Sequence, residues 1–227
     1  MISIIIPTYN ERENIELLIG KIKDQSNKIN EELEIIIVDD NSPDGTWKMV
    51  QEMGTKDKRI RLVKRAGKLG LATAVLDGVK KASGDKIIVM DADLSHPAEK
   101  LPEFAEWLRE VDLVIGSRNI RGGGSDDWPI YRKIVSMGAT FLANIVLGVW
   151  ESDPMSGFFG VKKKIIENTK FKAKGYKILL NILAYNKGIK IKEIPYMFKD
   201  RYAGETKLGS GEIVTYLKDL YSLRKQE

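Results

Sequence analysis

The 227-residue sequence contains no cysteine and a single histidine, His96. Without cysteine the chain has no disulfide framework and no thiolate that could bind a metal or attack a substrate, which is compatible with a reducing compartment. A lone histidine followed directly by Pro97 does not suggest a histidine-based catalytic triad. We therefore interpret His96 as a structural turn residue beside the neighbouring aspartates.

The sequence also lacks a basic amino-terminal leader with a cleavage-site pattern, and we expect no signal peptide and a cytoplasmic location. It has no apolar run of the roughly twenty residues that a membrane-spanning helix needs. The nearest candidate is residues 134–150, within a helical stretch at about 130–150, which is almost uncharged but carries Ser136, Thr140 and Asn144. We expect a helix that lies in a membrane interface without spanning it, and the alternative is a core helix under the sheet.

Charge of either sign is not concentrated anywhere along the chain. The net charge of +5 is a modest excess, and the composition of 43% hydrophobic and 30% charged residues is that of a globular chain. A chain of this size can form one large domain, which we place at residues 1–227. The positive excess favours anionic ligands or an anionic membrane surface, and we expect no nucleic acid partner.

Short apolar runs alternate with helical patterns through the first half of the chain. Strands are predicted at residues 3–7, 34–38, 59–64, 86–90 and 112–115, with helices at 15–22, from about 47, and at 70–81. Sequential strands separated by helices require right-handed crossovers and form a doubly wound α/β sheet. The ligand crevice of such a sheet lies beyond the carboxyl ends of its strands.

The second half of the chain is less regular. A turn at residue 153 leads into a strand ending at 161, followed by an amphipathic helix at 176–185, an alternating strand at 189–198 and a carboxyl-terminal helix at about 211–225. Residues 121–127 are rich in glycine. We predict that they form a mobile loop or lid, and the alternative is a plain linker.

Two aspartates follow the apolar strand at 86–90. Asp91 and Asp93 are two residues apart, so on an extended backbone both carboxylates lie on one face. With no cysteine or histidine cluster nearby, this oxygen-only pair suits Mg²⁺ or Mn²⁺, which completes its shell with water and phosphate. The alternative is that both aspartates cap the helix that follows. Asp39 and Asp40 end an earlier strand in the same way, and this convergence favours a site over a cap.

Several separated segments, in their order along the chain, point to one family. They are residues 7–11 (Pro-Thr-Tyr-Asn-Glu), 38–46 (Val-Asp-Asp-Asn-Ser-Pro-Asp-Gly-Thr), 91–97 (Asp-Ala-Asp-Leu-Ser-His-Pro), 116–118 (Gly-Ser-Arg) and 201–207 (Arg-Tyr-Ala-Gly-Glu-Thr-Lys). This set resembles the inverting family 2 glycosyltransferases of GT-A fold, which is Rossmann-like, with a mostly parallel sheet and helices on both faces. The resemblance covers nearly the whole chain.

The resemblance implies a role for each matching residue. Positions that hold the nucleotide sugar are Pro7, Tyr9, Glu11, Val38, Asp40, Asp91, Ala92, Asp93, Arg118, Arg201 and Lys207. Those implied to hold the metal are Asp91, Asp93 and Ser95, where some relatives have glutamine in place of Ser95. The acceptor phosphate would meet Arg118, Arg132, Ser136, Arg201 and Lys207, and the residues closest to the chemistry would be Asp91, Asp93 and Arg118.

The resemblance is strongest to the members that transfer mannose, with inversion, from GDP-mannose to dolichyl or another polyprenyl phosphate. A lipid phosphate is ionised near neutral pH, which agrees with a sequence in which no lone catalytic base stands out. Two alternatives stay open, a UDP-glucose donor and a noncatalytic module that binds nucleotide sugar or anionic lipid. Some relatives carry transmembrane helices after this domain, whereas the short forms sit on the cytoplasmic face of a membrane or use a separate anchoring subunit.

Overall fold

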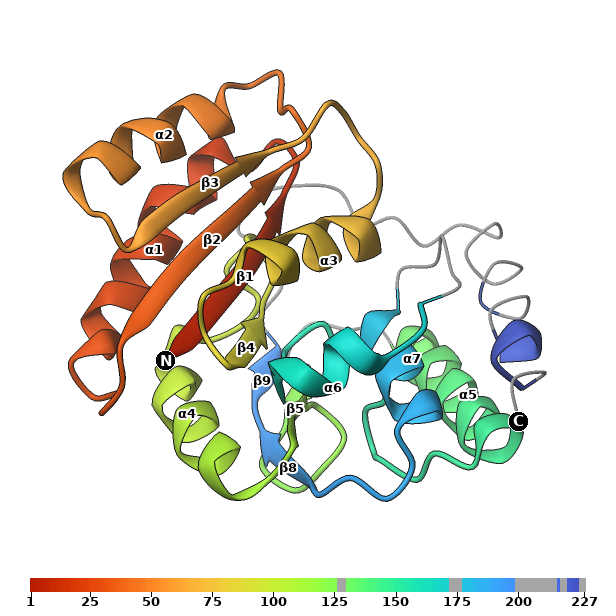
Figure 1. Cartoon of the computed structure of the whole chain (residues 1–227). Coiled ribbons are helices and arrows are strands. Elements are labelled where there is room, and N and C mark those ends of the chain that lie inside the picture. The colour runs from red at the N-terminus through yellow and green to blue at the C-terminus, as the bar shows by residue number, and fades with distance from the viewer. Residues whose placement is uncertain (126–129, 172–176, 199–215, 217–219, 225–227) are drawn as a thin grey trace.

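A seven-stranded sheet forms the centre of the protein (Figure 1). The computed structural model describes residues 1–125, 130–171, 177–198, 216 and 220–224, and of residues 130–136 only the backbone. The strand order is β3-β2-β1-β4-β7-β5-β8. The strands are β1 (Ile2–Thr8), β2 (Leu33–Asp39), β3 (Ile60–Lys64), β4 (Lys86–Val89), β5 (Leu113–Ser117), β7 (Phe159–Lys162) and β8 (Ile191–Pro195).

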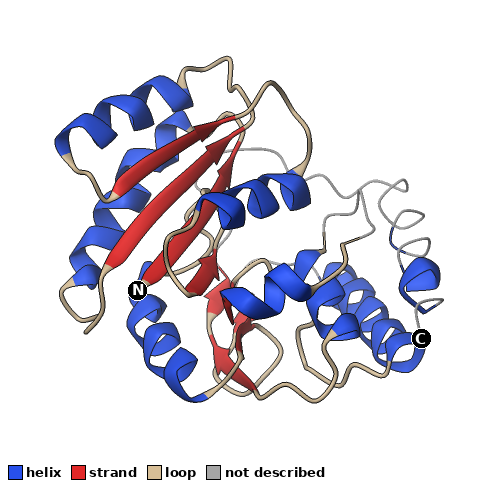
Figure 2. Ribbon diagram, viewed as in Figure 1, coloured by secondary structure: helices blue, strands red, loops and turns tan. Residues whose placement is uncertain are grey.

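Helices cover both faces of the sheet (Figure 2). One face packs against α1 (Arg12–Ser26), α2 (Thr46–Lys56) and α4 (Leu101–Glu110), which follows the short 3-10 helix η1 (Ala98–Lys100). The other packs against α3 (Leu71–Lys81), α5 (Ile130–Leu147), α6 (Lys163–Asn168) and α7 (Ile178–Tyr185). Successive strand residues alternate between the two cores, so Ile4 and Ile6 belong to one and Ile5 to the other. The predicted doubly wound α/β architecture is therefore confirmed.

One strand of the sheet runs against its neighbours. β7 pairs antiparallel with both β4 and β5, whereas β1, β2, β3 and β4 form a parallel run and β5 is parallel to β8. Because β7 is antiparallel, its first residue lies at the edge where β4 and β5 end. The segment before β7 is thereby brought to the carboxyl edge of the sheet.

The predicted strands and helices of the first half are present, with ends that differ by a few residues. Three features of the rest differ from prediction. No bounds were predicted for α4, and α6 was not predicted. The amphipathic pattern predicted for α7 is wrong, because every residue from Ile178 to Leu183 is buried in the core beside the sheet. The predicted strand at 189–198 is interrupted at Tyr196, which separates β8 from β9 (Met197–Phe198).

Residues 121–125 of the glycine-rich segment belong to the described part of the chain. Gly124 and Ser125 form β6, which pairs in parallel with β9. A Cβ on Gly123 would lie 2.5 Å from the carbonyl oxygen of Ser117, so this glycine permits a close approach of two chain segments. The pairing of β6 with β9 was not predicted, and the mobility of the segment stays a prediction. Residues 126 and 127 lie outside the described residues.

Helix α5 presents an apolar surface to solvent. Met137, Phe141 and Ile145 are 65%, 66% and 59% exposed and follow one another at four-residue spacing on one side of the helix. Ala143 and Leu147 point into the core on the other side, and so does Thr140. Within the described residues, no helix combines the length and the apolarity needed to cross a bilayer.

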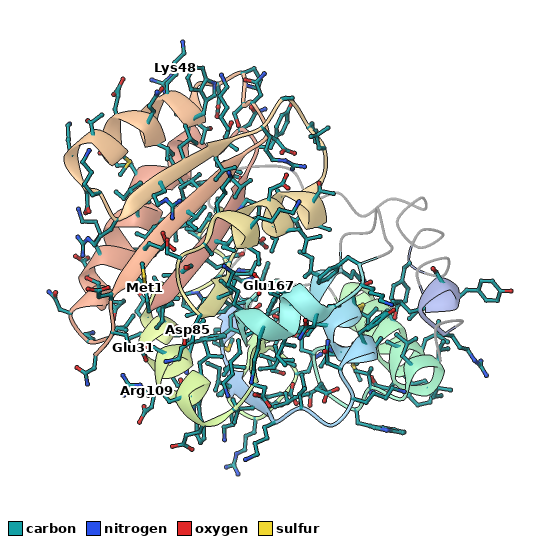
Figure 3. All side chains as sticks on the ribbon, viewed as in Figure 1. Met1, Glu31, Lys48, Asp85, Arg109 and Glu167 are labelled. Atoms are coloured by element: carbon teal, nitrogen blue, oxygen red, sulfur yellow. The ribbon has the colours of Figure 1, made fainter. Side chains whose placement is uncertain are left out.

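An ionic cluster joins the amino ends of the central strands (Figure 3). Glu31 accepts hydrogen bonds from Lys86 Nζ at 2.7 Å, Arg109 Nε at 3.0 Å and the amino terminus at 3.4 Å. Burial opposes the ionisation of Glu31, but the hydrogen bonds from Lys86 and Arg109 lower its pKa to about 2. The ionised carboxylate therefore stabilises the fold above the usual glutamate pKa.

We expect Glu31→Gln to lower the free energy of unfolding by roughly 2 kcal/mol at pH 7. The folded-state pKa lies below the unfolded value, so this stabilisation is complete above about pH 4.5 and is lost as the pH falls towards 2. Urea unfolding of wild type and variant at pH 7 and at pH 2.5 measures the difference. Glu32→Gln, at an exposed neighbouring position, is the control. An equal deficit of Glu31→Gln at both pH values would contradict this account.

Candidate functional site

The predicted site residues of the first half gather at the carboxyl edge of the sheet. Tyr9 and Asp40 follow β1 and β2, which are neighbours, and Asp91 follows β4 on the other side of β1. Arg118 follows β5, which β7 separates from β4. The structure thus brings residues from four strands to one edge, the place where an open α/β sheet binds its ligands.

The loops after β1 and β2 are joined by polar contacts. The buried carboxylate of Asp39 accepts hydrogen bonds from the hydroxyls of Thr8 and Ser42 at 2.8 and 2.7 Å. The amide of Asn10 donates to the Ser42 hydroxyl, and the amide of Glu11 donates to the Thr46 hydroxyl. These contacts fix the backbone around Tyr9, whose side chain is 37% exposed. Asp39 therefore has a structural role here.

Unlike Tyr9, both Pro7 and Val38 are buried. The side chain of Val38 is fully buried in the core, and a Cβ on Gly78 of α3 would lie 3.0 Å from it. Pro7 is buried too, but it lines a small pocket that also contains Asp91 and Ser156. A contact between Val38 and a ligand would have to come from the main chain, whereas Pro7 is among the residues that line the pocket.

Asp40 is bound to the loop at residues 65–70. Its Oδ1 accepts a hydrogen bond from Arg65 Nη1 at 2.6 Å, and its Oδ2 accepts hydrogen bonds from the amides of Leu69 and Gly70 at 3.0 and 3.3 Å. Both Asp40 and Arg65 are buried, so this is a desolvated ion pair with additional hydrogen bonds. The pair connects the end of β2 to the start of α3.

The acidic pair after β4 is held in a tight turn. Leu94 between Asp93 and Ser95 has a positive φ of 65°, a left-handed conformation that is unusual for leucine. Asp93 Oδ1 accepts hydrogen bonds from the amide of Ser95 at 3.1 Å and from its hydroxyl at 2.5 Å. Asp93, Ser95 and Ala92 are buried, whereas 36% of the Asp91 side chain is exposed. Ser95 therefore orients the Asp93 carboxylate.

His96 lies directly behind Asp91. The backbone amide of Asp91 donates to His96 Nδ1 at 2.9 Å, and His96 Nε2 lies 3.8 Å from Asp91 Oδ2. The imidazole is buried and stacks on Phe158, with 5.0 Å between the ring centroids. Burial lowers the pKa of His96 to about 4 despite the nearby charge of Asp93. The side chain is neutral at pH 7 and has the structural role that the sequence predicted.

Arg118 is fixed by a carboxylate from the segment before β7. Its Nε and Nη2 donate to Asp153 Oδ2 and Oδ1 at 2.7 and 2.8 Å, and its backbone amide also donates to Oδ2. Burial opposes the charged form, but the bonds to Asp153 raise the pKa of Arg118 above its usual range. The guanidinium is therefore a permanent cation in a fixed orientation at the edge of the site.

The aspartates after β4 fit a hard divalent cation. Among the described residues no three carboxylate or imidazole groups cluster into a complete metal cage. Gly157, however, faces Asp91: a Cβ there would come within 3.2 Å of Asp91 Oδ2, so the absence of a side chain keeps this oxygen accessible. Two carboxylates that leave coordination positions for water and phosphate oxygens suit Mg²⁺ or Mn²⁺.

The other four predicted site residues lie where the structure describes no side chain. Arg132 and Ser136 belong to α5, of which the structure describes only the backbone at these positions. Arg201 and Lys207 lie outside the described residues.

Sequence reasoning missed Asp153 and Arg65. Asp153 was noted only as part of a turn, although an acid between an apolar stretch and a buried strand, where Glu151 and Asp153 both lie, is a signal for a buried ion pair. Arg65, directly after β3, gave no such signal.

Comparison with known proteins gives a consistent result. The model of glycosyl transferase family 2 matches residues 3–169. A dolichol-phosphate mannosyltransferase of Pyrococcus furiosus is 43% identical over 229 aligned residues, which cover 100% of this chain and 64% of the relative. One of Saccharomyces cerevisiae is 37% identical, with 97% of this chain and 86% of the relative covered. This chain therefore spans about two thirds of the Pyrococcus protein.

The fold is also found among solved structures. A mannosyltransferase of Pyrobaculum calidifontis, solved in complex with GDP-Man and Mn²⁺, superimposes with a TM-score of 0.66 at 18% identity. The match covers 100% of this chain and 64% of that protein. The architecture is thus the GT-A fold that the resemblance implied.

Proposed function

Because this chain belongs to glycosyl transferase family 2, we propose that it transfers mannose from GDP-mannose to dolichyl or another polyprenyl phosphate. The observation that carries the proposal is the 43% identity, over the whole chain, to a dolichol-phosphate mannosyltransferase. The positions of Tyr9, Asp40, Asp91 and Arg118 at one edge of the sheet support it.

The proposed reaction forms a bond between an oxygen of the acceptor phosphate and the anomeric carbon, while the bond from that carbon to the diphosphate breaks. Attack from the opposite face inverts the configuration. The acceptor is ionised near pH 7, so the site needs no strong general base, and a neutral, buried His96 agrees with this. The fixed cation of Arg118 reduces the repulsion between two anionic substrates that must approach each other.

We propose that a divalent cation, Mg²⁺ or Mn²⁺, is held by Asp91 and Asp93. When bound, it offsets the negative charge that develops on the leaving nucleoside diphosphate. Ser95 was implied as a third ligand, and its hydroxyl donates to Asp93 Oδ1. Its contribution in this proposal is to orient Asp93. The Gly157 position keeps Asp91 Oδ2 open to the cation.

A donor screen tests the proposed activity. The purified protein is incubated with a polyprenyl phosphate, Mn²⁺ and either GDP-mannose or UDP-glucose, and the glycolipid product is measured. We expect product from GDP-mannose. If only UDP-glucose gives product, the donor is UDP-glucose and not GDP-mannose. If neither donor gives product, the result favours the noncatalytic binding module.

We further propose that the protein lies on the cytoplasmic face of a membrane, through α5 or with the help of a separate anchoring subunit. The exposed apolar side chains Met137, Phe141, Leu142 and Ile145 support the first route. A membrane interface accommodates such a face, and the proposed acceptor is itself a lipid.

Phe141→Asp is expected to weaken binding to anionic lipid vesicles by about tenfold or more, because burial of one phenylalanine contributes roughly 1.5–3 kcal/mol. Vesicle flotation measures the bound fraction. Leu17→Asp, at an exposed apolar position on α1, is the matched control and should bind as wild type does. Equal flotation of all three proteins, or no flotation of the wild type, would reject the proposal for α5.

Arg201→Ala and Lys207→Ala are each expected to lower kcat/KM for the acceptor by about tenfold to a hundredfold. Hydrogen bonds from charged groups to phosphate contribute roughly 1.5–3 kcal/mol each. Lys207→Arg should restore activity only in part, since a planar guanidinium replaces a compact ammonium. Steady-state kinetics at saturating donor, with a melting curve for each variant, measures both effects. Unchanged kcat/KM in both alanine variants would remove these residues from the site.

A further inference from the structure

The loop at residues 65–70 is exposed to solvent but fixed in position. Ala66, Lys68 and Leu69 are exposed, whereas Arg65 at its base is buried. Arg65 donates from Nη1 to Asp40 Oδ1 at 2.6 Å and from Nη2 to the Thr73 hydroxyl at 2.6 Å. Asp40 Oδ2 accepts from the amides that follow Lys68 in the chain. A loop held at both ends in this way presents its middle residue in a restricted position.

That middle residue is Lys68, and it lies against Tyr9. Lys68 Nζ is 4.2 Å from the centroid of the Tyr9 ring. Tyr9 follows β1, Asp40 follows the neighbouring β2, and 37% of the tyrosine is exposed at the carboxyl edge of the sheet. An exposed aromatic ring in such a crevice offers a surface on which a nucleobase can stack. Because an exposed contact between a cation and an aromatic ring is weak, a base can displace the ammonium from it.

Three of the roughly four acceptor positions of the Asp40 carboxylate are already occupied, which leaves it little capacity to read the base. Each of its carboxylate oxygens already accepts hydrogen bonds from the 65–70 loop or from Arg65. Asp40 and Arg65 are therefore positioning residues, which set where Lys68 stands relative to Tyr9. A mobile ammonium on a fixed loop beside an aromatic ring is suited to donate to the edge of a stacked base.

We propose that Lys68 selects guanine as the base of the donor nucleotide. This inference rests on the proposed function, in which Tyr9 and Asp40 belong to the nucleotide site. With the base stacked on Tyr9, the displaced ammonium donates to O6 and N7, the two acceptors on one edge of guanine. Adenine carries an amino group beside N7, which repels a cation, and uracil, a smaller ring, presents only O4 on the corresponding edge. The expected preference is therefore GDP over both UDP and ADP.

Isothermal titration calorimetry in the presence of Mn²⁺ tests this assignment with GDP, UDP, ADP and 7-deaza-GDP, which lacks the N7 acceptor. Lys68→Met keeps the apolar stem and removes the charge at an exposed position, so folding should be unaffected. Lys64→Met is the matched control, because Lys64 Nζ also lies over an aromatic ring, 3.3 Å from the centroid of Trp47.

We expect Lys68→Met to weaken GDP binding by about tenfold, with little change for UDP and ADP, and we expect Lys64→Met to bind as wild type does. The wild-type protein should bind 7-deaza-GDP more weakly than GDP. Lys68→Met should bind the two nucleotides equally, because the hydrogen bond to N7 is already absent in this variant. Equal losses for all diphosphates would make Lys68 a phosphate contact and overturn the inference, as would unchanged GDP binding. If the wild-type protein binds no nucleotide, the proposed function is overturned, and this inference is overturned together with it.

Discussion

Asp93→Asn is expected to lower the rate of glycosyl transfer by about a thousandfold while leaving the fold intact. The change removes one anionic ligand from the proposed cation, whose charge stabilisation is worth several kcal/mol in a transition state. The fold should survive because the asparagine oxygen can still accept the hydrogen bonds from the amide and hydroxyl of Ser95. The loss should thus appear in catalysis and not in the melting temperature.

The measurement is the initial rate of product formation as a function of Mn²⁺ concentration, together with a melting curve. Asp24→Asn, an exposed carboxylate on α1, controls for the general effect of removing a negative charge. Transfer that survives Asp93→Asn unaltered would show that the cation assignment is wrong.

The second large effect is expected at Arg118. Arg118→Lys keeps the positive charge but cannot reproduce the two parallel hydrogen bonds to Asp153. We expect kcat/KM to fall by about a hundredfold, because the cation loses its orientation toward the substrates, and stability to fall by roughly 1–3 kcal/mol.

Asp153→Asn separates these two effects. It weakens the same buried pair but leaves the guanidinium in place, so it should cost comparable stability and less activity than Arg118→Lys. Kinetics with each substrate varied in turn and urea unfolding of both variants provide the comparison. If Arg118→Lys reduces stability with kcat/KM unchanged, Arg118 is a structural residue only.

Local sequence patterns predicted the first half of the fold well, for a physical reason. The strands β1, β2 and β4 are nearly continuous apolar runs buried on both faces, and such runs, separated by helices, permit few arrangements other than a parallel sheet. The antiparallel direction of β7 was not predicted, because a strand's direction depends on the path of the chain and not on its own residues. The helix α7 was misjudged, since its neighbours in space bury even its polar Asn181.

The site residues that could be predicted are those whose role depends on their neighbours in the sequence. Asp91 and Asp93 stand directly after a strand, so both their position and their chemistry could be read from adjacent residues. Asp153 and Arg65 could not be found in this way, because each acquires its role from a partner distant in the sequence, Arg118 and Asp40 respectively. A buried ion pair is a property of the folded chain.

The strand order has a consequence for how the protein is made. β5 lies between β7 and β8, and both of these are synthesised after it. The strands β1 to β4 can pair with one another as soon as they leave the ribosome, whereas β5 has no partner in this sheet until β7 arrives. Its apolar residues, all buried in the folded protein, stay exposed during that interval. The nascent chain should therefore be most vulnerable to aggregation and most dependent on chaperones just before β7 emerges.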